Sequence, residues 1–198
     1  MTKKVSVLIV SYNVKEYVAH AIDSLLKSNL DELEIIVVDN HSFDSTVEHI
    51  QTSYPDVKII ANQDNVGFGR AVNQAAAHAK GDYYLILNPD TVVQENTVST
   101  LTQYIQDHEE VGMIGPKILN SDGTLQPACK RSFPTLRVAI PKLLGLDKLF
   151  PKSKWAGKYN LTYLDPDQIN SVDAISGSCM FLSKDLFHEL GGFDEEFF

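Results

Sequence analysis

The stretch that decides the fold is Tyr83-Tyr84-Leu85-Ile86-Leu87-Asn88-Pro89-Asp90. Its run of bulky apolar residues is typical of a strand that is buried in a parallel sheet. Pro89 ends such a strand, because proline has no N–H for the ladder and restrains the preceding residue to an extended shape. Asp90 is therefore expected just past the carboxyl end of a strand, where open α/β sheets bind ligands. A carboxylate there suits a divalent cation and the phosphates that accompany it.

Similar apolar runs alternate with helical patterns before this stretch and after it. We expect strands, with helices between them, at residues 5–10, 33–38, 57–61, 83–87 and 111–114. Asn13 with Glu16, and Ser45 with Glu48, have the spacing of capping boxes, and Gly81 is placed as a helix C-cap. The order predicts an α/β fold with a mostly parallel, Rossmann-like sheet and helices on both faces.

The second part of the chain is mixed and less regular. Asp122-Gly123 indicates a hairpin. Residues 127–168 are predicted to form a long, partly helical excursion, with its best helix near residues 136–144. Two short strands are expected at residues 172–174 and 180–182, followed by a helix that Ser183 caps. At 198 residues the chain is expected to form one domain.

The composition excludes several classes of protein. The chain has 26 acidic and 17 basic residues and a formal net charge of −9, which argues against non-specific nucleic-acid binding. No apolar run is long enough for a signal peptide or a membrane span. Cys129 and Cys179 match neither a disulfide framework nor a zinc site. We therefore expect a cytoplasmic protein with reduced cysteines, and peripheral contact with the inner face of a membrane stays open.

Polar motifs follow four successive predicted strands. They are Ser11-Tyr12-Asn13, Asp39-Asn40, the segment NVGFGR at residues 65–70, and Asn88-Pro89-Asp90. Because the carboxyl ends of parallel strands lie along one edge of the sheet, these motifs are expected to converge. The alternative is that they serve only as turns and caps, and it weighs most for Asn13. A dehydrogenase is not indicated, because no G-x-G-x-x-G follows the first strand.

In their order and spacing, these motifs resemble those of the family-2 inverting glycosyltransferases with a GT-A fold, in particular the rhamnosyltransferase-like branch. The likeness continues through Ser176-Gly177-Ser178-Cys179-Met180 and the segment GGFDEEFF at residues 191–198. It implies transfer of a sugar from a UDP- or dTDP-sugar donor to a hydroxyl of a glycan or lipid-linked acceptor, in cell-surface polysaccharide synthesis. It also implies a nucleotide-binding half at residues 1–115 and an acceptor half at residues 116–198.

The resemblance assigns roles that suit the residue types. Tyr12 would stack on the nucleobase, and Asp39 would accept a hydrogen bond from the imide of a uracil or thymine ring. Arg70 would reach a phosphate, although a solvated helix position explains it equally well. The remaining residues assigned to the nucleotide are Ser11, Asn13, Asn65, Gly67 and Asn88.

Asp90 matches the last carboxylate of the family's D-x-D metal motif, so the resemblance implies Mg²⁺ or Mn²⁺ as the cofactor. Asn88 replaces the first carboxylate, which removes one negative charge from the site. Gly177, Asp194 and Glu195 are assigned to the acceptor side. The family's catalytic base is expected beyond Phe198, so we expect a chain that is truncated there. A non-catalytic module that binds nucleotide sugars, or a scaffold without a ligand, remains an alternative.

Overall fold

The computed structural model describes residues 4–30 and 32–197. Its contacts divide the chain into two units, one made of Met1–Ile114 with Gly177–Phe198 and the other of Gly115–Ser176. The C-terminal segment, which we assigned to the acceptor half, therefore groups with the first part of the chain. The expectations for the chain end at Phe198 lie outside the described residues.

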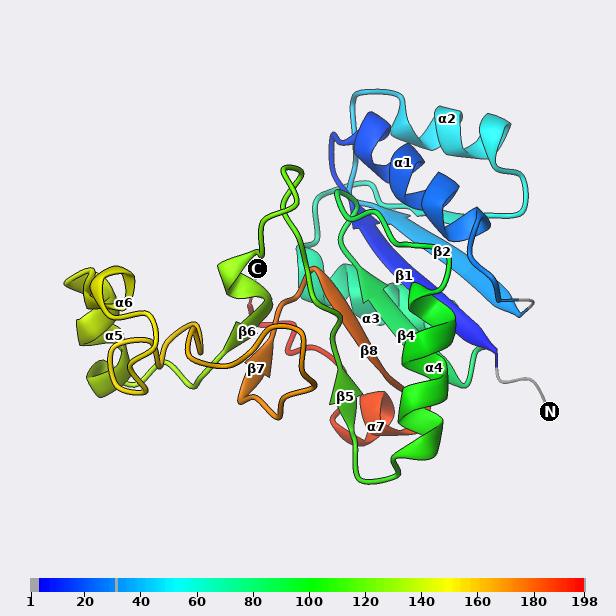
Figure 1. Cartoon of the computed structure of the whole chain (residues 1–198). Coiled ribbons are helices and arrows are strands. Elements are labelled where there is room, and N and C mark those ends of the chain that lie inside the picture. Colours follow the sequence, from blue (N-terminus) through cyan, green and yellow to red (C-terminus); the bar gives the residue numbers. More distant parts are fainter. Residues whose placement is uncertain (1–3, 31, 198) are drawn as a thin grey trace. The chain divides into compact units, whose positions relative to one another are not determined.

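The first unit is built on a six-stranded sheet with the order β3-β2-β1-β4-β8-β5 (Figure 1). Its strands are β1 Val5–Ser11, β2 Leu33–Asp39, β3 Lys58–Ala61, β4 Tyr83–Leu87, β5 Met113–Ile114 and β8 Cys179–Ser183. Strands β3, β2, β1 and β4 are parallel neighbours, and β8 is antiparallel to both β4 and β5. The mostly parallel sheet is confirmed. The insertion of β8 between β4 and the predicted fifth strand was not anticipated.

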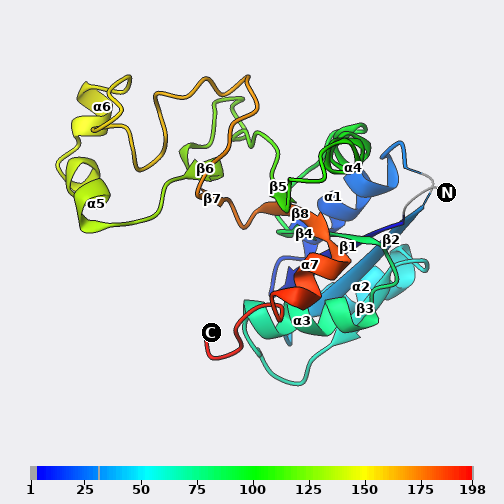
Figure 2. The same ribbon diagram turned by 90° about the horizontal axis from the view of Figure 1, so that it is seen from below.

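Helices cover both faces of this sheet, as predicted (Figure 2). They are α1 Lys15–Leu26, α2 Thr46–Ser53, α3 Phe68–His78, α4 Thr97–Asp107 and α7 Lys184–Glu189. Side chains alternate along β1, so that Leu8 joins a buried cluster with Val72 of α3 and Phe187 of α7. The opposite face carries α1 and α4. Across residues 4–30 and 32–197, no helix combines the length and the apolar character that crossing a bilayer requires.

Both predicted capping boxes are wrong, because the carboxylate of Asp44, which directly precedes Ser45, takes their place. The Asp44 carboxylate accepts hydrogen bonds from the backbone N–H of Lys15 at 2.9 Å and of Thr46 at 3.2 Å, which lie at the starts of α1 and α2. Asn13 and Ser45 make no capping bond to those helices. Partial burial acts to raise the pKa of Asp44, but the hydrogen bonds from Thr46 and Lys15 outweigh it and lower that pKa.

Gly81 is not a helix cap, since α3 ends at His78 with Ala79 as its C-cap. It lies where the chain enters β4, and its N–H donates to Ser6 Oγ at 2.9 Å. A Cβ atom at Gly81 would lie 2.6 Å from the backbone nitrogen of Ser6. Glycine is therefore required by the close approach of two backbones, not by helix termination.

We expect Gly81→Ala to lower the free energy of unfolding by about 1–3 kcal/mol, because the added methyl group forces β1 and β4 apart. Gly177→Ala is the matched control, since a Cβ there meets nothing within 4 Å. Urea denaturation of the two variants provides the measurement. Equal stability of Gly81→Ala and wild type would contradict the conclusion that the backbone of Ser6 requires a glycine at position 81.

The second unit is less regular, as the sequence predicts. It contains η1 Pro127–Cys129, α5 Leu136–Leu143 and α6 Leu146–Leu149, and a small antiparallel sheet of β6 Lys130–Arg131 and β7 Ala174–Ile175. The predicted hairpin is confirmed by a bridge between Leu119 and Leu125 on either side of Asp122-Gly123. The predicted helix near residues 136–144 is confirmed as α5.

Candidate active site

The register of the central strands brings the predicted site residues to one edge. Ser11 at the end of β1 pairs with Asp39 of β2, and Ile9 pairs with Leu87 at the end of β4. Neighbouring strands lie about 4.8 Å apart, so Asp39 and the turn after Leu87 flank the end of β1 on its two sides, separated by about 10 Å. Asp39 and Asp90 therefore share one edge of the sheet, as the sequence predicts.

Asp39 is a buried residue that is 1% exposed, and three donors hold its carboxylate. Ser11 Oγ donates to Oδ2 at 2.8 Å, and Ser42 donates to the same oxygen through Oγ at 2.5 Å and to Oδ1 through its N–H at 2.8 Å. A carboxylate has about four acceptor positions. Within the described residues, one position on Oδ1 is left for a ligand that donates a hydrogen bond.

Asn40 ties three strand-end segments together. Its backbone N–H donates to the Ser11 carbonyl at 2.9 Å, and its side chain donates to the Gly67 carbonyl at 3.3 Å and accepts from Asn62 at 2.9 Å. Sequence reasoning missed the roles of Asn40 and Ser42. Their position after Asp39 was the available signal. Ser42 bonds Asp39 three residues away, but the other partners of Asn40 and Ser42 lie 22 to 29 residues away.

Asn13 braces the loop after β1. Its N–H donates to Ser42 Oγ at 2.8 Å, and its Oδ1 accepts from the N–H of Phe43 at 2.8 Å. Tyr12 is 46% exposed and Phe43 is 75% exposed, so the two joined loops present two aromatic rings to solvent. Phe43 was not among the predicted residues, although an exposed aromatic ring beside Asp39 is an equally good stacking candidate.

The loop before α3 has the geometry of an Asx turn. Asn65 Oδ1 accepts a hydrogen bond from the N–H of Gly67 at 3.0 Å. Gly67 has a φ of 84°, which explains a glycine at this position, and it precedes the first residue of α3. Because β3 ends at the same edge as β1 and β2, the N-terminus of α3 also lies at this edge.

Arg70 contacts the C-terminal segment of the chain. Its Nε donates to the Glu195 carbonyl at 3.2 Å and lies 3.9 Å from Glu195 Oε2. Asn73 holds the same segment by accepting from the N–H of Phe193 and donating to its carbonyl, each at 2.9 Å. Asp194 and Glu195 are thus brought beside α3. The predicted contact of Arg70 with a phosphate stays a prediction.

The turn after β4 is held by the segment before β8. The Asn88 N–H donates to the Ser178 carbonyl at 3.0 Å, and Thr91 donates to the Asn88 carbonyl at 3.1 Å. Asp90 is exposed at the tip of this turn. Gly177 lies next to Ser178, so the structure brings this predicted acceptor residue near Asp90 in the same unit. The neighbouring Cys179 is buried, and burial raises the pKa of its thiol to about 12, which disfavours the thiolate form.

The donor set at Asp90 determines what cation it could hold. Among residues 4–30 and 32–197, no three His, Cys, Asp or Glu side chains are grouped to bind a metal ion. Asp90 and Asn88 offer one carboxylate and one amide oxygen. This suits Mg²⁺ or Mn²⁺ only if phosphate oxygens and water supply the other ligands, a mode that is common for Mg²⁺.

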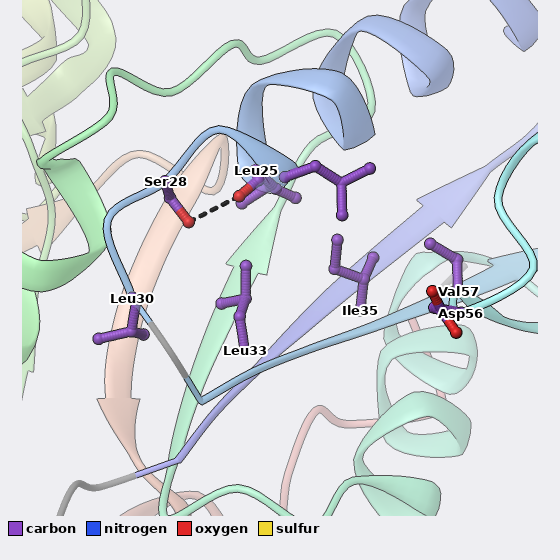
Figure 3. A pocket seen from close by; sticks show the side chains of 8 residues that line it. Leu25, Ser28, Leu30, Leu33, Ile35, Asp56 and Val57 are labelled. Atoms are coloured by element: carbon purple, nitrogen blue, oxygen red, sulfur yellow. Dashed lines mark hydrogen bonds between the residues drawn. The ribbon is translucent and has the colours of Figure 1, made fainter.

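A cavity of about 220 Å³ lies at the opposite edge of the sheet. Figure 3 shows that Leu25 of α1, Ser28 just after α1, and Leu33 and Ile35 of β2 line it. Leu33 is the first residue of β2, whereas Asp39 is the last. The cavity is therefore separate from the polar edge that carries Asp39 and Asp90.

The fold and the polar edge define an α/β protein of the GT-A glycosyltransferase class. The chain belongs to glycosyl transferase family 2, whose sequence profile matches residues 6–191.

Curated relatives agree with this assignment. The N-acetylglucosaminyl-diphospho-decaprenol L-rhamnosyltransferase of Mycobacterium tuberculosis is 26% identical over 209 residues, which cover 100% of this chain and 67% of the relative. Glycosyltransferase GlyG of Streptococcus pneumoniae is 30% identical over 118 residues, or 58% of this chain and 39% of GlyG.

Two solved structures share the fold. The mannosyltransferase PcManGT from Pyrobaculum calidifontis, in complex with GDP-Man and Mn²⁺, superposes with a TM-score of 0.66 at 18% identity, covering 99% of this chain and 49% of that chain. S. aureus TarS 1–349 in complex with UDP gives a TM-score of 0.66 at 21% identity, covering 98% and 51%. This chain thus spans about half the length of these neighbours.

Proposed function

We propose that this chain binds a UDP- or dTDP-sugar and a divalent cation and forms the donor site of an inverting sugar transfer. The observation that carries the proposal is the Asp39 carboxylate, which is buried and fixed by three donors with one acceptor position left. Uracil and thymine present an imide N–H that such an acceptor can bind, whereas cytosine lacks that donor. Tyr12 and Phe43 supply exposed rings for stacking on the base.

At the other end of the donor, Asp90 would hold Mg²⁺ or Mn²⁺, with Asn88 as a second oxygen ligand. When bound, the cation would neutralise the charge that develops on the departing diphosphate. Backbone hydrogen bonds to Ser178 and Thr91 hold the main chain of the turn that carries Asn88 and Asp90.

The acceptor would be a hydroxyl of a glycan or a lipid-linked sugar. The name of the mycobacterial relative, which describes a decaprenol-linked acceptor, supports this part of the proposal. A base must take the proton from the attacking hydroxyl. We assign that role neither to Asp194, which accepts a hydrogen bond from the Glu196 N–H, nor to Glu195, which is engaged by Arg70 and Asn73.

A thermal-shift panel tests the proposal. UDP and dTDP are expected to raise the melting temperature in the presence of Mn²⁺, because a ligand at about 100 times its Kd stabilises the folded state by about 2.7 kcal/mol. The shift should shrink in EDTA and should be smaller for CDP and ADP, whose bases lack a ring N–H donor. Equal shifts for all four nucleotides, or none, would contradict an imide-binding site at Asp39.

A non-catalytic nucleotide-sugar module is the second candidate, and Asn88 in place of a carboxylate is the observation that favours it. The two functions share the predicted binding behaviour. They differ in turnover, because only a transferase releases UDP from a UDP-sugar in the presence of an acceptor.

A further inference from the structure

Large apolar side chains are exposed together in the unit Gly115–Ser176. Of the 18 large apolar residues that the structure describes as exposed, eight lie within residues 133–155. Single exposed apolar residues are normal on a protein surface, but a concentrated group of them marks a contact surface.

Helix α5 presents part of this group as one stripe. Leu136 is 83% exposed, Ile140 is 51% exposed and Leu143 is 83% exposed. Their spacing of four and three residues places them on one side of the helix. Val138 and Pro141 are buried on another side. Helix α5 therefore packs through one side and leaves an apolar stripe uncovered within the described residues.

The apolar surface continues after α5. Leu149 at the end of α6 is 70% exposed, Phe150 is 61% exposed and Trp155 is 57% exposed. Helices α5 and α6 lie side by side in both views of the chain (Figures 1 and 2). Trp155 is the single tryptophan of the sequence.

The same segment is strongly basic, in contrast to the rest of the chain. Residues 130–158, which we call the basic apolar segment, contain eight of the 17 basic residues and one of the 26 acidic residues, a formal charge of +7 in a chain of −9. The acidic residue is Asp147, which is buried and pairs with Lys142 at 2.7 Å. Arg137, Lys148, Lys152, Lys154 and Lys158 are exposed.

We propose that the basic apolar segment docks the protein on an anionic phospholipid bilayer. A helix with an apolar stripe and flanking Lys and Arg residues lies in the plane of a membrane interface, with the apolar side chains among the acyl chains and the bases at the headgroups. Tryptophan favours the same interface. A second copy of this chain fits less well. If the same segment of each copy met in a dimer, two surfaces that each carry a formal charge of +7 would repel each other. The proposal does not rest on sugar transfer, since it uses none of the donor-site residues.

Vesicle binding by the 198-residue chain tests the proposal, and the fluorescence of Trp155 reports on the environment of the segment. We expect co-sedimentation with vesicles of phosphatidylcholine and phosphatidylglycerol, and a blue shift of Trp155 emission as the ring leaves water. Vesicles of phosphatidylcholine alone should bind at least about tenfold more weakly, and raising the salt concentration should weaken binding to the anionic vesicles.

Two variants separate the apolar and electrostatic contributions. Leu136→Ser/Leu143→Ser and Lys148→Glu/Lys152→Glu/Lys154→Glu are each expected to reduce binding by about tenfold or more. The matched controls are Leu26→Ser/Leu190→Ser and Lys27→Glu/Lys58→Glu/Lys80→Glu, which change exposed residues outside the segment and should bind like wild type.

The proposal is overturned if the wild-type chain stays in the supernatant with anionic vesicles, or if the segment variants bind as tightly as their controls. It is also overturned if light scattering shows a dimer that Leu136→Ser/Leu143→Ser dissociates while no vesicles are bound. In that case a second copy covers the surface.

Discussion

Asp90→Ala is expected to abolish the Mn²⁺-dependent part of UDP binding while leaving the stability of the fold unchanged. Asp90 is exposed at the tip of a turn, so its removal leaves no cavity. It supplies the only carboxylate of the Asn88-Pro89-Asp90 turn, so no second acid there can retain the cation. We therefore expect the affinity for UDP in the presence of Mn²⁺ to fall to the value measured in EDTA.

Calorimetric titration of UDP with Mn²⁺ and with EDTA measures this effect. The control is Asp56→Ala, which removes an exposed carboxylate just before β3, at the opposite edge of the sheet. Asn88→Asp should act in the opposite direction and tighten Mn²⁺ binding, because it restores a second carboxylate. Retention of Mn²⁺-dependent UDP binding by Asp90→Ala would exclude Asp90 as the ligand.

Asp39→Asn is expected to weaken UDP binding by about 10- to 100-fold, because a hydrogen bond to a charged acceptor is worth about 1.5–3 kcal/mol. It should also narrow the preference for UDP over CDP. A carboxylate only accepts hydrogen bonds, whereas an amide can donate to the ring nitrogen of cytosine. Competition binding of UDP and CDP to wild type and variant measures both changes.

Ser42→Ala is the control that separates recognition from folding. It removes one of the three donors that hold Asp39, because the Oγ donor at 2.5 Å is lost while the Ser42 N–H donor remains. The variant should lose stability but keep the preference for UDP. If Asp39→Asn discriminates between UDP and CDP as strongly as wild type does, Asp39 does not read the base.

The strands and their shared edge could be predicted because they depend on local patterns. Apolar runs of the type seen at β4 are buried on both faces, and successive parallel strands place Asp39 and Asp90 on one edge without further information. The capping of α1 could not be predicted in this way, since Asp44 reaches Lys15 across 29 residues and takes the position expected for Asn13. The spacing of residues near Asn13 does not reveal that a distant carboxylate binds the N–H groups at the start of the helix.

The same limit applies to the rest of the site. The contact of Arg70 with Glu195 joins residues 125 apart, and the placement of β8 between β4 and β5 depends on pairings between distant parts of the chain. Gly81 was interpreted from its position after a helix, although the backbone of Ser6, 75 residues away, is what requires a glycine. Contacts between residues that are far apart in the sequence leave no periodic pattern by which they could be predicted.

Crystals grown with UDP and Mn²⁺ offer the most direct test, through the anomalous scattering of the metal. We expect a manganese peak within coordination distance of the Asp90 carboxylate, bridged by the diphosphate to a uracil ring whose imide donates to Asp39. A manganese peak away from Asp90, or a uracil ring that makes no hydrogen bond with Asp39, would contradict a nucleotide-sugar site that extends from Asp39 to Asp90.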